Sequence, residues 1–284
     1  MIKIVTDYGF CYGVKNAIDT FSHLNRGKGT IYLTHPILHN EEENRKWMES
    51  LHARFISSDT ILSLDDTVVL SAHGHTIEEE NAYKGKAKIV DLTCPLILAR
   101  NKSIPAFQEG VSYFYLGKKD HQETIGFLSR FPYFQLIDAK GDVIQELLST
   151  KVEKKIVFVP QTTAGSDLYH QVLDFLRKKG DVIFSLPLCP KYASRALSSA
   201  ALAKELDPFK ACFLVCGDPS SSNAKEILSS IKKANPALFA SIVMKSDEVS
   251  SSLLKKDIYI TSATSVSSQV VLDLQKGLIE RSKV

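Results

Sequence analysis

The chain lacks the features that mark several common classes of protein. No apolar run in its 284 residues approaches the roughly 18–20 residues that a membrane-spanning helix needs. The net charge is only +3, and lysine and arginine are spread along the chain without a basic block. The GxGxxG fingerprint of dinucleotide-binding folds is also absent. We therefore expect neither a nucleic acid nor a membrane as a partner.

Secretion signals and zinc motifs are missing as well. The N-terminal sequence MIKIVTDYGF has neither the basic start nor the long apolar core of a signal peptide, which predicts a cytoplasmic location. In that compartment the five cysteines are expected to bind metal or take part in catalysis and not to form disulfides. No CxxC pair, the usual mark of a structural zinc site, is present.

Short strand-like and helix-like segments alternate along the whole chain. Ten segments have the pattern of buried strands, from IKIV near the start to DIYIT near the end. Between them lie helical patterns such as DLYHQVLDFLRKKG and NAKEILSSIKKA. This alternation predicts an α/β fold with small, mostly parallel sheets, whose ligands gather at the carboxyl ends of the strands.

Three cysteines indicate an internal repeat. Cys11 in GFCYGVKNAI, Cys94 in DLTCPL and Cys189 in LPLCPKYASRAL each lie between a strand-like and a helix-like segment. Two polar strand ends follow each cysteine: His39 and His73, then His121 and Thr162, then Ser221 and Ser265. We predict three similar α/β domains, residues 1–93, 94–188 and 189–284, around a pseudo-threefold axis and a central cluster cavity.

The residue types at these positions favour a particular chemistry. Three thiolates that converge on one point suit a soft metal centre, and an iron–sulfur cluster held by three cysteines leaves one iron open to a substrate. Histidine, serine, threonine and asparagine in front of helix N-termini suit a phosphate or diphosphate. Glu123 is a carboxylate two residues after His121 and is a candidate proton donor.

A known family shows the same motifs in the same order. The set GFCYGVKNAI, ILHN, SAHG, DLTCPL, HQE, QTT, SSN and TSATS resembles the iron–sulfur enzyme family of 4-hydroxy-3-methylbut-2-enyl diphosphate reductase, over essentially the whole chain. The resemblance implies a [4Fe–4S] cluster held by Cys11, Cys94 and Cys189. It also implies reductive dehydroxylation to isopentenyl and dimethylallyl diphosphate, the last step of the non-mevalonate isoprenoid pathway. Electrons would come from a one-electron donor such as ferredoxin or flavodoxin.

The resemblance implies roles for the polar residues too. Glu123 would deliver protons, and Thr162 would orient the alcohol of the substrate. The residues that would bind the diphosphate are His39, His73, His121, Ser221, Ser222, Asn223 and Ser265. The segments PLILARN after Cys94 and PKYASRA after Cys189 depart from the family pattern, so we expect a divergent member.

Other interpretations of the same residues remain open at this point. The chain could be a cluster-bearing diphosphate sensor or scaffold, for which a proton donor has no use, or a hydratase that consumes no reductant. Cys212 and Cys216, in the strand-like ACFLVC, are expected to be buried apolar residues. The remaining histidines are expected in loops or beside the site (His35, His75) or on the surface (His23, His52, His170).

Overall fold

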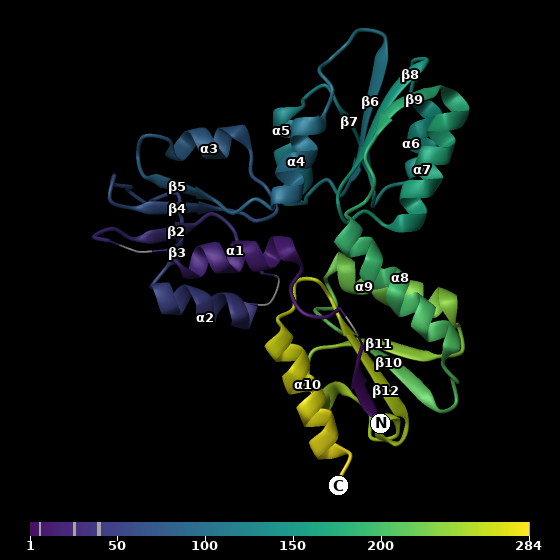
Figure 1. Ribbon diagram of the computed structural model, residues 1–284. Coiled ribbons are helices and arrows are strands. Elements are labelled where there is room, and N and C mark those ends of the chain that lie inside the picture. Colours follow the sequence, from purple (N-terminus) through teal and green to yellow (C-terminus); the bar gives the residue numbers. More distant parts are fainter. Residues whose placement is uncertain (6, 25–26, 39–40, 284) are drawn as a thin grey trace. The chain divides into compact units, whose positions relative to one another are not determined.

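The computed structural model describes residues 1–5, 7–24, 27–38 and 41–283 (Figure 1). The chain divides into two compact units. Unit 1 contains Met1–Lys15, Leu38–Glu41 and Pro190–Val284, and unit 2 contains Asn16–Ile37 and Glu42–Cys189. Within the described ranges, no helix is long and apolar enough to cross a membrane.

The first sheet of unit 2 has four parallel strands in the order β3-β2-β4-β5. The strands are β2 (Ile31–Leu33), β3 (Arg54–Phe55), β4 (Thr67–Leu70) and β5 (Lys88–Asp91). The helices between them are α2 (Glu41–Leu51) and α3 (Ile77–Tyr83). Every residue of β4 is buried, as expected for a central parallel strand that is covered on both faces.

The second sheet of unit 2 is also parallel, in the order β7-β6-β8-β9. Its strands are β6 (Val111–Gly117), β7 (Gln135–Asp138), β8 (Lys155–Pro160) and β9 (Asp181–Ser185). The helices are α4 (Pro95–Ser103), α5 (Gln122–Arg130), α6 (Val143–Ser149) and α7 (Ser166–Lys179). Tyr115 and Val159 pack with Phe127 of α5, whereas Phe114 and Phe158 belong to a second apolar cluster. Successive side chains of a strand point to opposite faces, so β6 and β8 build both cores.

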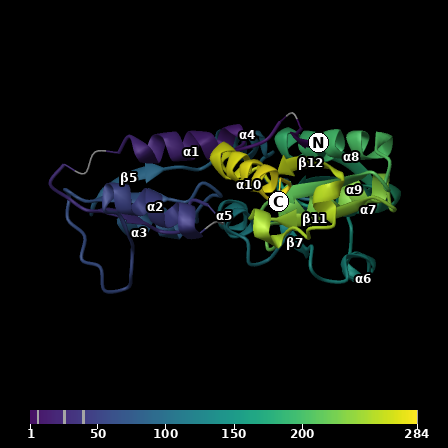
Figure 2. The same ribbon diagram turned by 90° about the horizontal axis from the view of Figure 1, so that it is seen from below.

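Unit 1 contains the third parallel sheet, in the order β1-β12-β10-β11. Its strands are β1 (Ile2–Ile4), β10 (Ala211–Cys216), β11 (Phe239–Val243) and β12 (Asp257–Ser262). Its helices are α8 (Pro190–Glu205), α9 (Ser222–Ala234) and α10 (Ser268–Arg281), with short 3-10 turns at Ser246–Glu248 and Leu253–Lys255. Helix α1 (Tyr12–Ser22) follows Cys11. In Figure 2 the N-terminal mark lies beside β12, in agreement with the pairing of β1 and β12.

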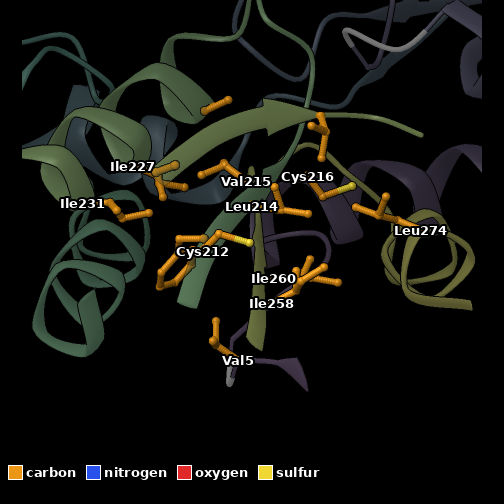
Figure 3. Close-up of a cluster of buried hydrophobic side chains, with 14 of the residues drawn as sticks. Val5, Cys212, Leu214, Val215, Cys216, Ile227, Ile231, Ile258, Ile260 and Leu274 are labelled. Carbon is orange, nitrogen blue, oxygen red and sulfur yellow. The ribbon is translucent and has the colours of Figure 1, made fainter. Parts of the chain in front are cut away.

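The core of unit 1 contains the two cysteines of β10. Figure 3 shows Cys212 and Cys216 among buried side chains such as Ile227, Ile258 and Leu274. Both cysteines are fully buried, so the prediction that they are apolar core residues is confirmed.

The three sheets share one strand order when β1 is counted after β12. The equivalent orders are β5-β4-β2-β3, β9-β8-β6-β7 and β1-β12-β10-β11. In each, the last strand lies at one edge and leads to a cysteine: β5 to Cys94, β9 to Cys189 and β1 to Cys11. The N-terminal strand therefore completes the sheet of the third segment, which differs from the prediction that residues 1–93 form one domain. The pairing of β1 with β12 joins residues more than 250 positions apart, and no local pattern in the sequence reports it.

This strand order explains where the polar loops lie. The two central strands of each sheet are its first and third in chain order, and the chain leaves them towards opposite edges. The loops after these strands flank a topological switch point, where ligands of parallel α/β sheets usually bind. The predicted α/β class with small parallel sheets is confirmed, while the pseudo-threefold axis stays a prediction. Two strands, β3 and β9, were not predicted: β3 is only two residues long, and β9 is a short edge strand with an irregular register.

Candidate active site

The backbone holds the three predicted ligand cysteines in the same way. The amide N–H of Cys11 donates to Thr264 O, that of Cys94 to Ala72 O and that of Cys189 to Thr162 O, each over 3.0 Å. Each acceptor lies two residues beyond the end of the third strand of its sheet, β12, β4 or β8. The three cysteines therefore occupy equivalent positions, each tied to the loop at the switch point of one sheet.

The exposure of the thiols separates these three cysteines from the other two. Cys11, Cys94 and Cys189 are partly exposed, and none of the five cysteines forms a disulfide. Burial raises the pKa of the Cys212 thiol to about 11, so this group stays protonated at neutral pH. A metal centre needs thiolates, and only the three partly exposed cysteines can present them at a surface.

The donor chemistry can be compared with the implied cluster. Across the residues with described coordinates, no group of three or more His, Cys, Asp or Glu side chains could hold a metal ion. What the repeat provides is one accessible thiol after each of the three sheets. A set of ligands that consists only of thiols is typical of an iron–sulfur cluster and not of a calcium or magnesium site, whose ligands are oxygen atoms.

A buried acid and a hydroxyl meet at the switch point of the second sheet of unit 2. Thr162 donates to Glu123 twice, from its backbone N–H to Oε1 over 2.7 Å and from its hydroxyl to Oε2 over 2.6 Å. Glu123 is in the first turn of α5, and its own N–H donates to Nδ1 of the N-cap residue His121. Only 7 % of Glu123 and 8 % of Thr162 is exposed. The Cys189 N–H donates to the Thr162 carbonyl, so the acid–hydroxyl pair is one hydrogen bond away from a cysteine loop.

The surroundings of Glu123 shift the pKa of its carboxyl group in opposite directions. Burial raises the pKa of this carboxyl group above its usual value, because the charged form is poorly solvated. The hydrogen bonds from Thr162 and the positive charge of Arg100 lower the pKa and only partly offset burial. A carboxyl group with a raised pKa keeps its proton to a higher pH, which suits a general acid.

The same arrangement occurs in unit 1 with an amide in place of the acid. Asn223, also in the first turn of its helix, accepts from the Thr264 N–H through Oδ1 over 2.7 Å. Ser221 caps α9 by accepting from the Ala224 N–H, as expected for the SSSN motif. Nδ2 of Asn223 is buried and has no hydrogen-bond partner among the residues that the structure describes. This unsatisfied donor at a helix N-terminus, next to the loop that contains Ser265, is available to an anionic ligand.

Two of the predicted histidines come together in unit 2. The rings of His73 and His121 lie edge to face with their centroids 5.8 Å apart. His73 is in the loop after β4, and His121 is the N-cap of α5, so the pair joins the two sheets of unit 2. Two imidazoles with a helix N-terminus beside them can donate to phosphate oxygens.

The other histidines lie as predicted. His75 is buried and contacts Arg130 Nη2 over 2.8 Å and Glu80 Oε2 over 3.3 Å. His35 pairs with Glu79 at 3.5 Å. The exposed histidines are His23, His52 and His170.

The predicted site residues thus divide between the two units. Unit 2 contains Cys94, Cys189, His73, His121, Glu123 and Thr162, and unit 1 contains Cys11, Ser221, Ser222, Asn223 and Ser265. His39 lies outside the described residues.

The sequence interpretation missed two polar residues beside Glu123. Arg100 of α4 donates through Nη2 to Pro160 O over 2.7 Å and through Nη1 to Pro187 O, and its charge acts on Glu123 and Cys189. Gln161 is 1 % exposed and accepts from the Lys118 N–H over 2.9 Å, which ties the loop after β8 to the end of β6. The signal for Arg100 was a basic residue six positions after a cysteine, which occurs after Cys94 and again after Cys189.

Comparisons with known proteins give the family. The chain matches the LytB protein family over residues 2–278. The 4-hydroxy-3-methylbut-2-enyl diphosphate reductase of Clostridioides difficile is 28 % identical over 279 residues, which is 95 % of this chain and 96 % of the relative. The Aquifex aeolicus protein of the same name is 29 % identical over 244 residues, 83 % of this chain and 81 % of the relative.

Solved structures agree with the fold. A reductase structure from Plasmodium falciparum aligns with a TM-score of 0.78 and 25 % identity, over 96 % of this chain and 86 % of that one. A second reductase structure aligns with a TM-score of 0.71 over 98 % of this chain and 99 % of that one, at 24 % identity, which bears on the fold alone. The predicted resemblance is confirmed, and the low identities agree with a divergent member. The chain belongs to the LytB protein family.

Proposed function

We propose that this protein reduces 4-hydroxy-3-methylbut-2-enyl diphosphate to isopentenyl and dimethylallyl diphosphate. The reaction breaks the carbon–oxygen bond of the terminal alcohol, consumes two electrons and two protons and releases water. The observation that carries the proposal is the buried Glu123–Thr162 pair, one hydrogen bond away from the Cys189 loop. Membership of the LytB family and relatives named as reductases support it.

Cys11, Cys94 and Cys189 would hold a [4Fe–4S] cluster in this proposal. When bound, the cluster supplies the two electrons one at a time, together with a Lewis acid for the alcohol. The equivalent backbone positions of the three cysteines support this assignment, because each one presents a partly exposed thiol from the same kind of loop.

Polar residues in the loops that follow the strands would hold the diphosphate. We assign this role to His39, His73, His121, Ser221, Ser222, Asn223 and Ser265. The unsatisfied Nδ2 of Asn223 and the N-termini of α5 and α9 support the assignment, since both features attract anions.

Glu123 and Thr162 would handle the proton. Hydroxide is a poor leaving group, so the alcohol must be protonated as the carbon–oxygen bond breaks. Burial keeps Glu123 protonated to a higher pH, so this acid would supply the proton, and the Thr162 hydroxyl, 2.6 Å away, would orient the alcohol of the substrate towards it. The diphosphate donors bind the far end of the substrate and cannot do this.

The electron donor would be a one-electron carrier such as ferredoxin or flavodoxin, and we propose that the protein works in the cytoplasm. Neither a nucleic acid nor a membrane is required by the proposed reaction.

The proposal is tested on protein purified without oxygen. We expect about four irons and four sulfides per chain after reconstitution and formation of both products when a chemical reductant is supplied. Turnover that needs no reductant would identify a hydratase instead. A chain that binds the diphosphate tightly but turns nothing over would be a sensor or scaffold.

A further inference from the structure

Arg100 holds two separate pieces of backbone in unit 2. Its guanidinium donates to Pro160 O, the last residue of β8, over 2.7 Å, and to Pro187 O, two residues before Cys189. Arg100 is in α4, six residues after Cys94. One side chain therefore joins the helix that follows one cysteine to the backbone that precedes another.

Arg195 makes the matching contacts in unit 1. It donates through Nη1 to Ser262 O, the last residue of β12, over 3.1 Å, and to Gly9 O, two residues before Cys11, over 2.9 Å. Its Nη2 also donates to Asp7 Oδ1 over 2.9 Å, and only 2 % of Arg195 is exposed. Arg195 is in α8, six residues after Cys189. The two arginines are thus equivalent in the repeat, in position and in both acceptors.

The loop before Cys94 shows which contact the two arginines replace. The residue six positions after Cys11 is Ala17, which is fully buried and has no donor in its side chain. There the Leu92 N–H, two residues before Cys94, donates directly to Leu70 O at the end of β4 over 3.3 Å. Pro187 has no N–H to make this bond, and the Gly9 N–H donates to Ser262 Oγ instead. An arginine is therefore present at the two loops where the direct backbone bond is missing.

We infer that Arg100 and Arg195 are positioning residues that fix the backbone before Cys189 and Cys11 for binding of the cluster. The inference rests on the proposed function, because that function gives these cysteines their role. A planar guanidinium can donate to two carbonyl groups at once, so it holds the strand end and the cysteine loop in one fixed relation. The ammonium of a lysine is a single point and cannot reproduce this geometry.

The first test uses the metal-free full-length chain. We compare Arg100→Met, Arg195→Met and the more conservative Arg100→Lys and Arg195→Lys by amide hydrogen exchange. Arg177→Met, a change at an exposed arginine of α7, is the matched control. Arg100→Met should speed exchange at least about fivefold in segments 160–164 and 186–190 only, and Arg195→Met should do so in segments 7–12 and 262–266 only. Unchanged exchange, or an equal rise throughout the chain, would overturn the inference.

The second test loads the same variants with iron and sulfide in the absence of oxygen. Each methionine variant should retain less than half of the wild-type cluster and give an altered electron paramagnetic resonance spectrum, with partial recovery in the lysine variants. Faster local exchange together with a wild-type cluster content and spectrum would show that the arginines only stabilise loops. If the wild-type chain itself takes up no cluster, the proposed function fails, whereas the exchange experiment still decides whether the arginines hold the loops.

Discussion

Three features of Glu123 bear on the role of general acid that we propose for it. It is almost fully buried, it receives two hydrogen bonds from Thr162, and its pKa is raised because burial outweighs those hydrogen bonds. The HQE motif was enough to predict this acid. Its contact with Thr162, 39 residues along the chain, depends on the adjacency of β6 and β8, which the sequence does not state.

Replacement of Glu123 by glutamine separates binding from chemistry. Glutamine keeps the size and the hydrogen-bonding capacity of the side chain but has no proton to transfer. We expect Glu123→Gln to retain the cluster and to bind substrate, while turnover falls by about 10²–10⁴-fold. Single-turnover kinetics and substrate titration on reconstituted protein measure the two effects. Wild-type turnover in this variant would mean that another group is the proton source.

The pKa of Glu123 should respond to Thr162. The hydrogen bond from the Thr162 hydroxyl lowers this pKa. Thr162→Val removes that hydrogen bond and should therefore raise the pKa of Glu123 further, because burial is then offset less. A reaction that needs protonated Glu123 slows as the pH rises through the pKa of Glu123. In Thr162→Val, the alkaline limb of the pH profile of kcat should therefore move to higher pH. The rate itself should fall less than in Glu123→Gln. Thr163→Val is the control and should leave the limb in place; an unmoved limb in Thr162→Val would contradict the assignment.

The cysteines can be tested one at a time. Cys94→Ser should abolish or destabilise the cluster, because three thiolates leave none to spare. Cys212→Ala should keep it, since Cys212 is fully buried in the core of unit 1. Absorption near 400 nm, roughly the region of iron–sulfur charge transfer, reports the cluster on protein kept free of oxygen. Full absorption in Cys94→Ser, or its loss in Cys212→Ala, would refute the ligand set.

At the scale of the elements, contacts between distant segments of the backbone position the candidate site residues, and the local sequence pattern does not report these contacts. Alternating apolar segments predicted most strands, because strand burial has a short-range signature. The arginine contacts were not predictable, since each joins a helix to carbonyl groups that are 60 or more residues away. The equivalent N–H bonds of the three cysteines were not predictable either, because each joins the cysteine to a loop after another strand and no local pattern reports such a contact.

The fit of α5 against the loop after β4 gives a prediction for this element. A Cβ atom at Gly126 would lie 2.7 Å from His75 O, a backbone atom that Arg130 also binds. Alanine favours an isolated helix by about 1 kcal/mol over glycine. The contact with fixed backbone should outweigh this gain, because overpacking costs about 1–3 kcal/mol. Gly126→Ala should therefore lower the free energy of unfolding in urea and weaken substrate binding, as His73 and His121 lie on the two sides of this contact.

The neighbouring variant Ile125→Ala is the control for Gly126→Ala. Ile125 is partly exposed on the same helix, so its truncation should change substrate binding little. Equal losses of binding in the two variants would mean that α5 responds to any substitution, and that the close approach at Gly126 has no special role.

At the scale of the whole molecule, the third sheet takes its last strand from a distant part of the sequence. The first two sheets receive their last strand by a short connection, from α3 to β5 and from α7 to β9, whereas the last strand of the third sheet, β1, precedes the other three in the sequence. The sequence showed three cysteines in order but not that the first of them closes the third sheet. That fact depends on the pairing of β1 with β12, the longest-range strand contact in the described part of the chain.

A circular permutant tests this organisation of the chain. Gln275 Nε2 of α10 donates to Ile2 O over 3.1 Å, and Arg281 lies six residues further on, about 9 Å along the helix. A flexible linker of about six residues spans up to roughly 20 Å and should join the two ends. With new termini at Ile61, which is 93 % exposed, the permutant should fold with a free energy of unfolding within about 1–2 kcal/mol of wild type.

Cluster content is the decisive measurement on this permutant, because β1 and the Cys11 loop remain joined to each other and gain a connection from α10. We expect wild-type iron and sulfide per chain. A matched variant that lacks residues 1–5 keeps Cys11 but loses β1, so Arg195 and β12 would face a loop with no strand to anchor it. This truncation should lose most of its cluster. If the permutant lacked the cluster while the truncated variant kept it, β1 would not act as the last strand of the third sheet.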